Sequence, residues 1–507
     1  MPQTPFWAKP KFVALAILAY LAVHFAVRMA MWPTLGIDDS EQALFSQQFA
    51  WSYRNQAPPL FTWLLIGVGR VFGVNIVAIS LIRYALLAIA FGFAYATARR
   101  LIADPRFSAL SLYSFAAIYV FAFYSHHDLT HTTAMAAMLA VAWYVFVRLA
   151  AEPRLGWYLA LGAVFGFGFL GKWNFLMFAA ALPLACLALP DYRRLVFTWK
   201  ILPAVAICAV LVLPTALAAL AEGATGTASG VLVGGDEPYP VRVVEGIGRL
   251  TASALLYPQP LLSLLLIVFA APLWRGLRIP SRAETRPSLA FLVWTMAISL
   301  ALHLALVLAL GAREFHERLM QPPLFILPIA LFMLIERGRP SKRAVDIFAL
   351  MLAVLVAGTL AARITVFLLG ADHCGSCRDM APFRALAADL RDTGYSGQGT
   401  IVAGGYHIGG NMRVVFPEAR IVDASAPAHI WPPPRDDGPC LLLWQERDPE
   451  KTAGDRAWVE SYLAGELHGP RDARRREGVV SELMFGSDKR QYRLAFALYD
   501  GAAGDCR

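Results

Sequence analysis

Long apolar runs separated by short polar segments follow one another along most of the chain. About 20 helical residues cross the hydrocarbon core of a bilayer, and runs near that length predict about eleven transmembrane helices. The runs lie at residues 12–30, 76–97, 109–124, 132–147, 157–170, 175–189, 201–221, 255–274, 289–310, 319–335 and 344–369. The fifth and sixth runs are the shortest, and the pattern specifies them least.

A mixed polar sequence begins near residue 370, where the long apolar runs stop. Its periodicity predicts helices and strands in alternation, and therefore an α/β domain over 370–507. The predicted helices are 382–393 and 458–463, and the predicted strands are 400–403, 420–422, 440–444 and 492–499. The glycines between Gly404 and Gly410 superficially suggest a phosphate loop, but their spacing fits neither nucleotide-binding fingerprint, so we predict a turn.

The predicted transmembrane domain, residues 1–369, includes a first outer loop at 31–75. Within that loop, residues 46–53 have the pattern of a short amphipathic helix lying on the membrane. Lys and Arg gather in alternate loops, as at Arg99 and Arg100. Because cytoplasmic loops carry this excess, we expect a cytoplasmic N-terminus, and an odd number of spans then makes the α/β domain periplasmic.

Composition agrees with this class of protein. Hydrophobic residues make up 58% of the chain and charged residues 16%, and the mean hydropathy is +0.52. So few charges exclude an ordinary soluble enzyme and indicate an α-helical polytopic membrane protein. The formal net charge of +9 is mostly a topology signal, and nothing in it indicates a nucleic-acid partner.

The six cysteines fall into two groups. Cys186 and Cys208 lie in apolar runs and are expected to be packing residues. The other four, at Cys374, Cys377, Cys440 and Cys506, fall in the predicted external domain, where disulfides persist. An even set there favours structural bridges over a redox centre or a zinc site, and their pairing stays open.

Polar residues cluster at the ends of spans on one predicted face of the membrane. The four clusters are Asp38, Asp39 and Glu41; His126, His127, Asp128 and His131; Lys172 and Asn174; and Arg313, Glu314, His316, Glu317 and Arg318. Transporters place such groups near mid-membrane. Their concentration at one surface instead indicates an interfacial active site.

Each cluster also has a simpler interpretation. Asp38 or Asp39 could cap a short helix in a solvated loop. The histidines have spacing that could hold a metal, but a hairpin tip is polar in any case. Lys172 and the arginines could extend to the interface to keep their charges in water. Arg313 and Arg318 share a short loop with His316, which favours a phosphate-binding site. An anionic phosphate needs several donors, and Arg offers them in a rigid fork.

Four motifs resemble those of a known family. Residues 38–42, Asp-Asp-Ser-Glu-Gln, and 56–63, Gln-Ala-Pro-Pro-Leu-Phe-Thr-Trp, are similar to patterns of the bacterial family 39 (PMT-type) glycosyltransferases. Gly171 to Asn174 and Phe315 to Pro322 resemble later motifs of the same family, and the tail matches more loosely. The family belongs to the GT-C superfamily, with the protein O-mannosyltransferases and the lipid A aminoarabinose transferase.

The resemblance implies a GT-C fold and sugar transfer from a polyprenyl-phosphate donor on the periplasmic face. It implies that Asp38 is the general base, with Asp39, in place of the usual Glu, as a supporting acceptor. Some relatives carry Lys or His before Pro-Pro-Leu, where this chain has Gln56 and Ala57, so more of the phosphate binding falls to other cations. The predicted site comprises Asp38, Asp39 and Glu41 for catalysis, Lys172, Arg313, His316 and Arg318 for the donor phosphate, and Tyr53, Gln56, His126, His127, Asp128, His131 and Asn174 for substrates.

These residue types suit the implied chemistry. A carboxylate takes the proton of the acceptor hydroxyl as the anomeric carbon is attacked, and cations stabilise the departing phosphate. Direct attack without an enzyme nucleophile inverts the anomeric centre. Such a donor has no diphosphate for a metal to neutralise, so we expect no cofactor, with an incidental divalent metal left open.

We therefore predict a glycosyltransferase of a Gram-negative inner membrane whose acceptor is lipid A or another envelope glycolipid. Two alternatives stay open. One is the same chemistry with a protein or polysaccharide acceptor, and the other is a flippase or transporter of lipid-linked sugars.

Overall fold

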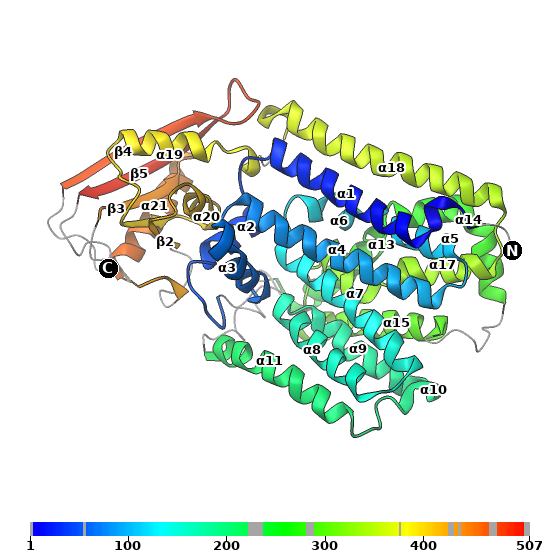
Figure 1. Ribbon diagram of the computed structural model, residues 1–507. Helices are drawn as coiled ribbons and strands as arrows, with labels where there is room; N and C mark the ends of the chain where they lie inside the picture. Colours follow the sequence, from blue (N-terminus) through cyan, green and yellow to red (C-terminus); the bar gives the residue numbers. More distant parts are fainter. Residues whose placement is uncertain are drawn as a thin grey trace.

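The computed structural model describes residues 4–53, 57–221, 237–279, 288–374, 377–423, 430–433, 438–465 and 474–500. A bundle of long helices and a smaller domain built on a β-sheet lie end to end (Figure 1). The N-terminus is at the end of the bundle far from the sheet domain. The predicted division into a helical part and an α/β part therefore corresponds to two regions of the molecule.

Among the described residues, seven helices are long and apolar enough to cross a membrane. They are α1 (Pro10–Met31), α4 (Ile76–Leu101), α7 (Thr130–Ala151), α11 (Ile201–Ala221), α14 (Leu261–Arg278), α15 (Leu289–Leu310) and α18 (Lys342–Leu369). A bent pair, Glu317–Leu324 followed by Leu327–Arg337 with an angle of 53°, makes an eighth span if it is counted as one. The second of these segments is α17, and the first comprises η4 (Glu317–Met320) and α16 (Gln321–Leu324).

The remaining predicted spans are shorter or broken. The fifth and sixth correspond to α8 (Leu155–Gly171) and α9 (Phe175–Ala188), which are apolar but have 17 and 14 residues. The third prediction, a single helix at 109–124, is wrong. This stretch divides into α5 (Pro105–Tyr113), η2 (Ser114–Ala117), α6 (Tyr119–Ala122) and the start of η3 (Tyr124–His126). The backbone N–H of Tyr119 donates to the carbonyl of Gln259 at 3.2 Å, so this segment pairs with a distant loop where a continuous helix would pair with itself.

Other short helices complete the bundle. They are η1 (Phe6–Ala8), α2 (Ile37–Phe45), α3 (Leu60–Phe72), α10 (Pro190–Arg193) and α13 (Tyr239–Leu256). Polar caps set several boundaries. The side chain of Asn75 accepts from the N–H of Ala78 at the start of α4, and that of Ser341 accepts from Ala344 at the start of α18. Such caps satisfy N–H groups that have no partner within the helix.

The C-terminal domain has a five-stranded mixed sheet in the order β2-β1-β3-β5-β4. Its elements are η5 (Ala371–His373), η6 (Arg378–Met380), α19 (Phe383–Asp392), β1 (Thr400–Ala403), α20 (Tyr406–Val415), β2 (Arg420–Asp423), β3 (Cys440–Gln445), α21 (Pro449–Gly465), β4 (Arg474–Leu483) and β5 (Gln491–Asp500). Strand β1 is parallel to β2 and β3, while β5 is antiparallel to β3 and β4. Both predicted helices and all four predicted strands are present.

Two elements of this domain differ from the predictions. The expected turn at 404–410 is wrong beyond Gly405, because Tyr406 begins helix α20. Strand β4 was not predicted.

A disulfide joins Cys374 to Cys377, and Cys440 is disulfide-bonded as well, as expected for structural bridges. Cys506 lies outside the described residues.

Helix α2 lies where the bundle meets the C-terminal domain, and it packs against α20 (Figure 1). The predicted helix at 46–53 is wrong, because α2 ends at Phe45 and the chain then turns. The Ser46 hydroxyl donates to the carbonyl of Ala43 at 2.8 Å, and the Tyr53 hydroxyl donates to that of Gln48 at 2.9 Å. These local bonds compete with the continuation of the helix.

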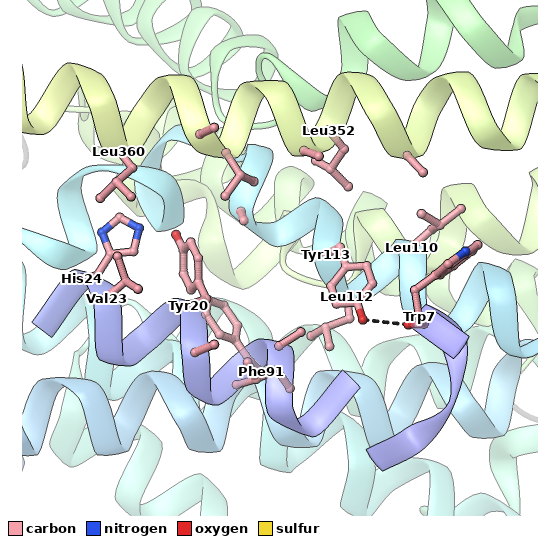
Figure 2. Close-up of a pocket in the computed structure, with 18 residues that line it drawn as sticks. Trp7, Tyr20, Val23, His24, Phe91, Leu110, Leu112, Tyr113, Leu352 and Leu360 are labelled. Atoms are coloured by element: carbon pink, nitrogen blue, oxygen red, sulfur yellow. Dashed lines mark hydrogen bonds between the residues drawn. The ribbon is translucent and has the colours of Figure 1, made fainter. Parts of the chain in front are cut away.

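A cavity of about 560 Å³ lies between α1 and α18. Figure 2 shows its lining, with Trp7 and Tyr113 toward one end and Tyr20 and His24 toward the other. Most of the other lining side chains are apolar, among them Phe91 and Leu352. None of the predicted site residues lines this cavity, so the candidate site lies elsewhere.

Candidate active site

Helix α2 carries the three predicted catalytic acids. Gly36 is its N-cap, and Asp38 and Asp39 lie in its first turn, where the helix dipole favours negative charge. Asp38 is half-buried. In the part of the chain that the structure describes, its carboxylate forms no hydrogen bond or ion pair. A carboxylate placed at a helix start without a partner is available to a substrate.

Asp39 has a different environment, although it is the next residue. Its side chain is fully buried. One carboxylate oxygen lies 3.5 Å from Nη2 of Arg28 in α1, and the other forms an ion pair with Arg83 in α4. These two guanidinium groups occupy the carboxylate, which gives Asp39 a structural place between helices.

Asp128, in the loop before α7, holds the start of α2. Its carboxylate accepts from the backbone N–H of Asp38 at 3.3 Å and from that of Asp39 at 3.2 Å. Burial raises the pKa of Asp128 well above its usual value, and the nearby charges of Asp38 and Asp39 raise it further. The contact fixes the first turn of α2 to the bundle.

Lys172 and Arg318 bring positive charge to the same region. Lys172 follows α8, and its Nζ donates to the Thr132 hydroxyl of α7 at 2.7 Å. Burial lowers the pKa of Lys172 to about 7, and the charge of Arg318 lowers it as well, whereas the charge of Asp38 opposes the shift. Arg318, in η4, is exposed and has no ion-pair partner among the described residues. Lys172 therefore lies close enough to both Arg318 and Asp38 for their charges to act on it.

Asn174 connects the segments that carry these two cations. Its Nδ2 donates to the carbonyl of Leu319 at 2.8 Å, next to Arg318. Its Oδ1 lies 3.2 Å from Nε2 of His303 in α15. These contacts make Asn174 a link between the α8–α9 loop and η4, and its predicted role in substrate binding stays a prediction.

Arg313 and His316 are placed differently from Lys172 and Arg318. Arg313 forms ion pairs with Glu237 at 2.8 Å and Glu245 at 2.9 Å, so two carboxylates offset its charge. His316 is exposed, and its nearest ionic contact is Glu314 at 3.9 Å. Neither residue has a described contact with Asp38 or Lys172.

The predicted cluster between η3 and α7 does not converge on one point. His126 stacks on His24 of α1 with 3.7 Å between ring centroids, while His127 forms an ion pair with Asp379 of the C-terminal domain. His131 lies 3.6 Å from Glu41. Asp128 contacts the start of α2, so the four side chains have four different sets of partners. Within the described residues, no group of three or more His, Cys, Asp or Glu side chains could hold a metal ion.

Another predicted substrate-binding residue, Tyr53, lies apart from this arrangement. Tyr53 is buried and stacks on Phe45 with 5.3 Å between ring centroids, so it shapes the turn after α2. Gln56 lies outside the described residues.

Sequence reasoning missed the buried arginines that surround Asp39. Arg28 and Arg83 lie inside apolar runs that were predicted as spans. A charged residue inside such a run is costly and usually has a partner. That cost was an available signal, although it does not identify the partner.

Chemically, the site has a carboxylate that can accept a proton and two cations that can hold an anion. Asp38, Lys172 and Arg318 are charged groups in one region at the end of the bundle. This combination suits a reaction that removes a proton from a hydroxyl and creates negative charge on a leaving group.

Comparisons with known proteins show which proteins the chain is similar to. Residues 56–217 match the family model described as Dolichyl-phosphate-mannose-protein mannosyltransferase. The chain is 27% identical to Lipopolysaccharide core galacturonosyltransferase RgtA of Rhizobium johnstonii, over 89% of this chain and 90% of the relative. It is 30% identical to Lipopolysaccharide core galacturonosyltransferase RgtB of the same organism, over 84% and 86%.

Solved structures show a similar fold. The crystal structure of ArnT from Cupriavidus metallidurans bound to undecaprenyl phosphate superposes with a TM-score of 0.58 at 15% identity, covering 96% of this chain and 98% of ArnT. The cryo-EM structure of arabinofuranosyltransferase AftD from Mycobacteria gives a TM-score of 0.50 at 15% identity, covering 98% of this chain and 40% of AftD.

Proposed function

Since the chain belongs to the PMT-type family of GT-C membrane glycosyltransferases, we propose that it transfers a sugar from a polyprenyl-phosphate donor to lipopolysaccharide. The lipopolysaccharide acceptor is suggested by the activity named for both curated relatives, RgtA and RgtB. The donor class is suggested by the undecaprenyl phosphate bound to ArnT, which has a similar fold. Galacturonic acid is the first sugar to test, because both relatives are named for its transfer.

In the proposed reaction, Asp38 accepts the proton of an acceptor hydroxyl. The hydroxyl oxygen forms a bond to the anomeric carbon of the donor sugar, and the bond from that carbon to the phosphate oxygen breaks. The configuration at the anomeric carbon inverts, because no enzyme nucleophile intervenes. A positioned carboxylate of this kind contributes about 100- to 10,000-fold in rate.

Lys172 and Arg318 stabilise the leaving polyprenyl phosphate. Negative charge grows on the phosphate oxygens as the bond breaks, and cations already in place near those oxygens lower the energy of the transition state. The two protein cations supply this charge, and a monophosphate donor has no diphosphate to neutralise. We therefore propose a reaction without a metal cofactor.

We place the reaction on the periplasmic face of the inner membrane. The excess of Lys and Arg in alternate loops supports a cytoplasmic N-terminus. The N-terminus and the C-terminal domain lie at opposite ends of the bundle (Figure 1), and α2 lies next to that domain. The site at the start of α2 would then face the periplasm.

One observation carries this proposal. The Asp38 carboxylate has no partner among the residues that the structure describes, and its charge acts on Lys172, as does that of Arg318. The test of the proposal is mass spectrometry of lipopolysaccharide from cells that lack the gene. The cells are complemented with the wild-type gene, with Asp38→Asn, or with the control Asp392→Asn, whose side chain is exposed on α19. All three proteins are first brought to equal levels in the membrane.

We expect wild type and Asp392→Asn to restore one sugar mass and Asp38→Asn not to restore it. Full restoration by Asp38→Asn would remove Asp38 from the role of base. A lipopolysaccharide profile that is unchanged by the deletion would reject lipopolysaccharide as the acceptor.

A further inference from the structure

Helix α2 is held on one side by the C-terminal domain. The bundle contacts α2 through Asp128 and through the ion pairs of Asp39, as described above. Helix α20 packs along another side. The helix that carries the proposed base therefore depends on both parts of the molecule for its position.

Asn411 of α20 connects to the chain on both sides of Asp38. Its Oδ1 accepts from the backbone N–H of Leu35 at 3.0 Å. Its Nδ2 lies 3.1 Å from the Ser40 hydroxyl and 2.8 Å from the carbonyl of His407, to both of which it donates. Asn411 is 3% exposed, and a buried hydrogen-bonding group that loses its partner destabilises the fold. Its side chain thus joins the residues before and after Asp38 to the C-terminal domain.

Gly410 sets how closely α20 approaches α2. A Cβ added at this position would overlap the backbone of Ser40, including its carbonyl oxygen and Cα. A backbone atom can move away only if its helix moves. The close approach of α20 to α2 therefore requires a glycine, which has no Cβ, at position 410.

Two further contacts fix the flanks of α2 to the same domain. The Thr34 hydroxyl, before the helix, donates to the carbonyl of Ala381 at 2.7 Å. The Gln47 amide, after the helix, donates to the carbonyl of Ile421 at 2.8 Å and accepts from the N–H of Ile421 at 3.0 Å. Gln47 thus makes the paired bonds that a neighbouring strand would make with the edge strand β2.

We propose that the C-terminal domain is a positioning element of the active site, in which Gly410 and Asn411 of α20 hold α2 where Asp38 meets the acceptor hydroxyl. The inference rests on the proposed role of Asp38 as base. Neither residue touches the reacting atoms, and both act through α2. A displacement of about 1 Å in a reacting group can cost about 100-fold in rate.

Gly410→Ala and Gly454→Ala form a matched pair for the test. Both glycines lie inside helices of the C-terminal domain, α20 and α21, and alanine is the better helix former in both. A Cβ at Gly454 meets no atom within 4 Å. The same substitution therefore displaces α2 in one variant only. Asn411→Ala is a second variant that removes contacts without adding volume.

The assay uses the purified full-length protein, undecaprenyl-phosphate-linked galacturonic acid as donor, and lipopolysaccharide from the deletion strain as acceptor. We expect Gly410→Ala to lower kcat by about 100-fold and Asn411→Ala by at least about tenfold. The KM of the donor should stay within about twofold, because Lys172 and Arg318 lie outside α2. Gly454→Ala should match the wild type. Amide hydrogen exchange of α2 should rise in the first two variants and not in the third.

Wild-type kcat in Gly410→Ala and Asn411→Ala would overturn the inference. So would losses of kcat that are accompanied by unchanged exchange in α2, because the effect would then not pass through that helix. An inactive wild type would count against the proposed function instead. Hydrogen exchange would in that case still decide whether Gly410 and Asn411 hold α2.

Discussion

Asp38→Asn and Asp39→Asn are the same substitution at neighbouring positions. The first should remove activity, and the second should lower the stability of the fold. Asp38 has no described partner, so its loss should remove activity and leave the fold intact. Asp39 is the carboxylate that contacts Arg28 and Arg83 in the described part of the chain. Its replacement by Asn leaves two buried guanidinium groups without the carboxylate that contacts them.

The magnitude follows from that burial. All three side chains are at most 2% exposed, and removing one partner of such a buried pair costs about 3–5 kcal/mol. This is a large part of the roughly 5–15 kcal/mol by which folded proteins are stable. At about 2 °C per kcal/mol for a large chain, the midpoint of thermal unfolding should fall by about 6–10 °C.

The assay is thermal unfolding in detergent, followed by intrinsic fluorescence, combined with the lipopolysaccharide profile. Asp38→Asn should unfold within about 1 °C of the wild type and fail to modify lipopolysaccharide. Asp39→Asn should unfold earlier, and its level in the membrane should fall. An Asp39→Asn protein with wild-type stability and no activity would refute the structural role and restore Asp39 as a catalytic acid.

Three other predictions concern the charges around Asp38. Because the ammonium of Lys172 is charged only below its pKa of about 7, kcat/KM for the donor should fall by roughly tenfold from about pH 6 to about pH 8. Lys172→Arg should flatten that profile, and a wild-type profile that is already flat would contradict the reasoning. Arg318→Gln should lower kcat by about 100-fold. Arg313→Gln should change kcat by less than about threefold, because two carboxylates already neutralise Arg313. Equal losses of kcat in the two variants would reject the distinction. Asp128→Ala should destabilise the start of α2 by about 1–3 kcal/mol, seen as faster amide hydrogen exchange there, and unchanged exchange would show that the contact does not hold the helix.

Local patterns were enough to predict most of the fold. Apolar runs found the seven long helices, and short strand-forming runs in the C-terminal part found four of the five strands. The broken stretch near residue 114 escaped because its backbone pairs with Gln259, far along the chain. Helix α20 was missed because its glycines, considered without their tertiary contacts, are typical of a turn. The requirement for glycine at position 410 follows from the fold, in which a Cβ there would overlap the backbone of Ser40.

The sequence located the polar groups of the candidate site but not their partners. Asp38, Lys172 and Arg318 stand out because they follow or precede apolar runs, and their roles stay predictions. The sequence placed Arg313 beside Arg318, and it did not show that Glu237 and Glu245 occupy the first of them. Partner choice depends on helices that are distant in sequence, and single-sequence patterns do not contain that information.

The four consecutive residues from Asp38 to Glu41 show how one short helix separates the proposed catalytic residue from residues with structural contacts. Successive helical residues point about 100° apart, so each side chain faces a different neighbour. Asp39 meets the arginines of the bundle, Ser40 meets Asn411, and Glu41 meets His131. Asp38 faces the region of Lys172 and has no described partner of its own. Since three sides of α2 are fixed, the register of the helix is fixed as well, and the fourth side is free to carry the base.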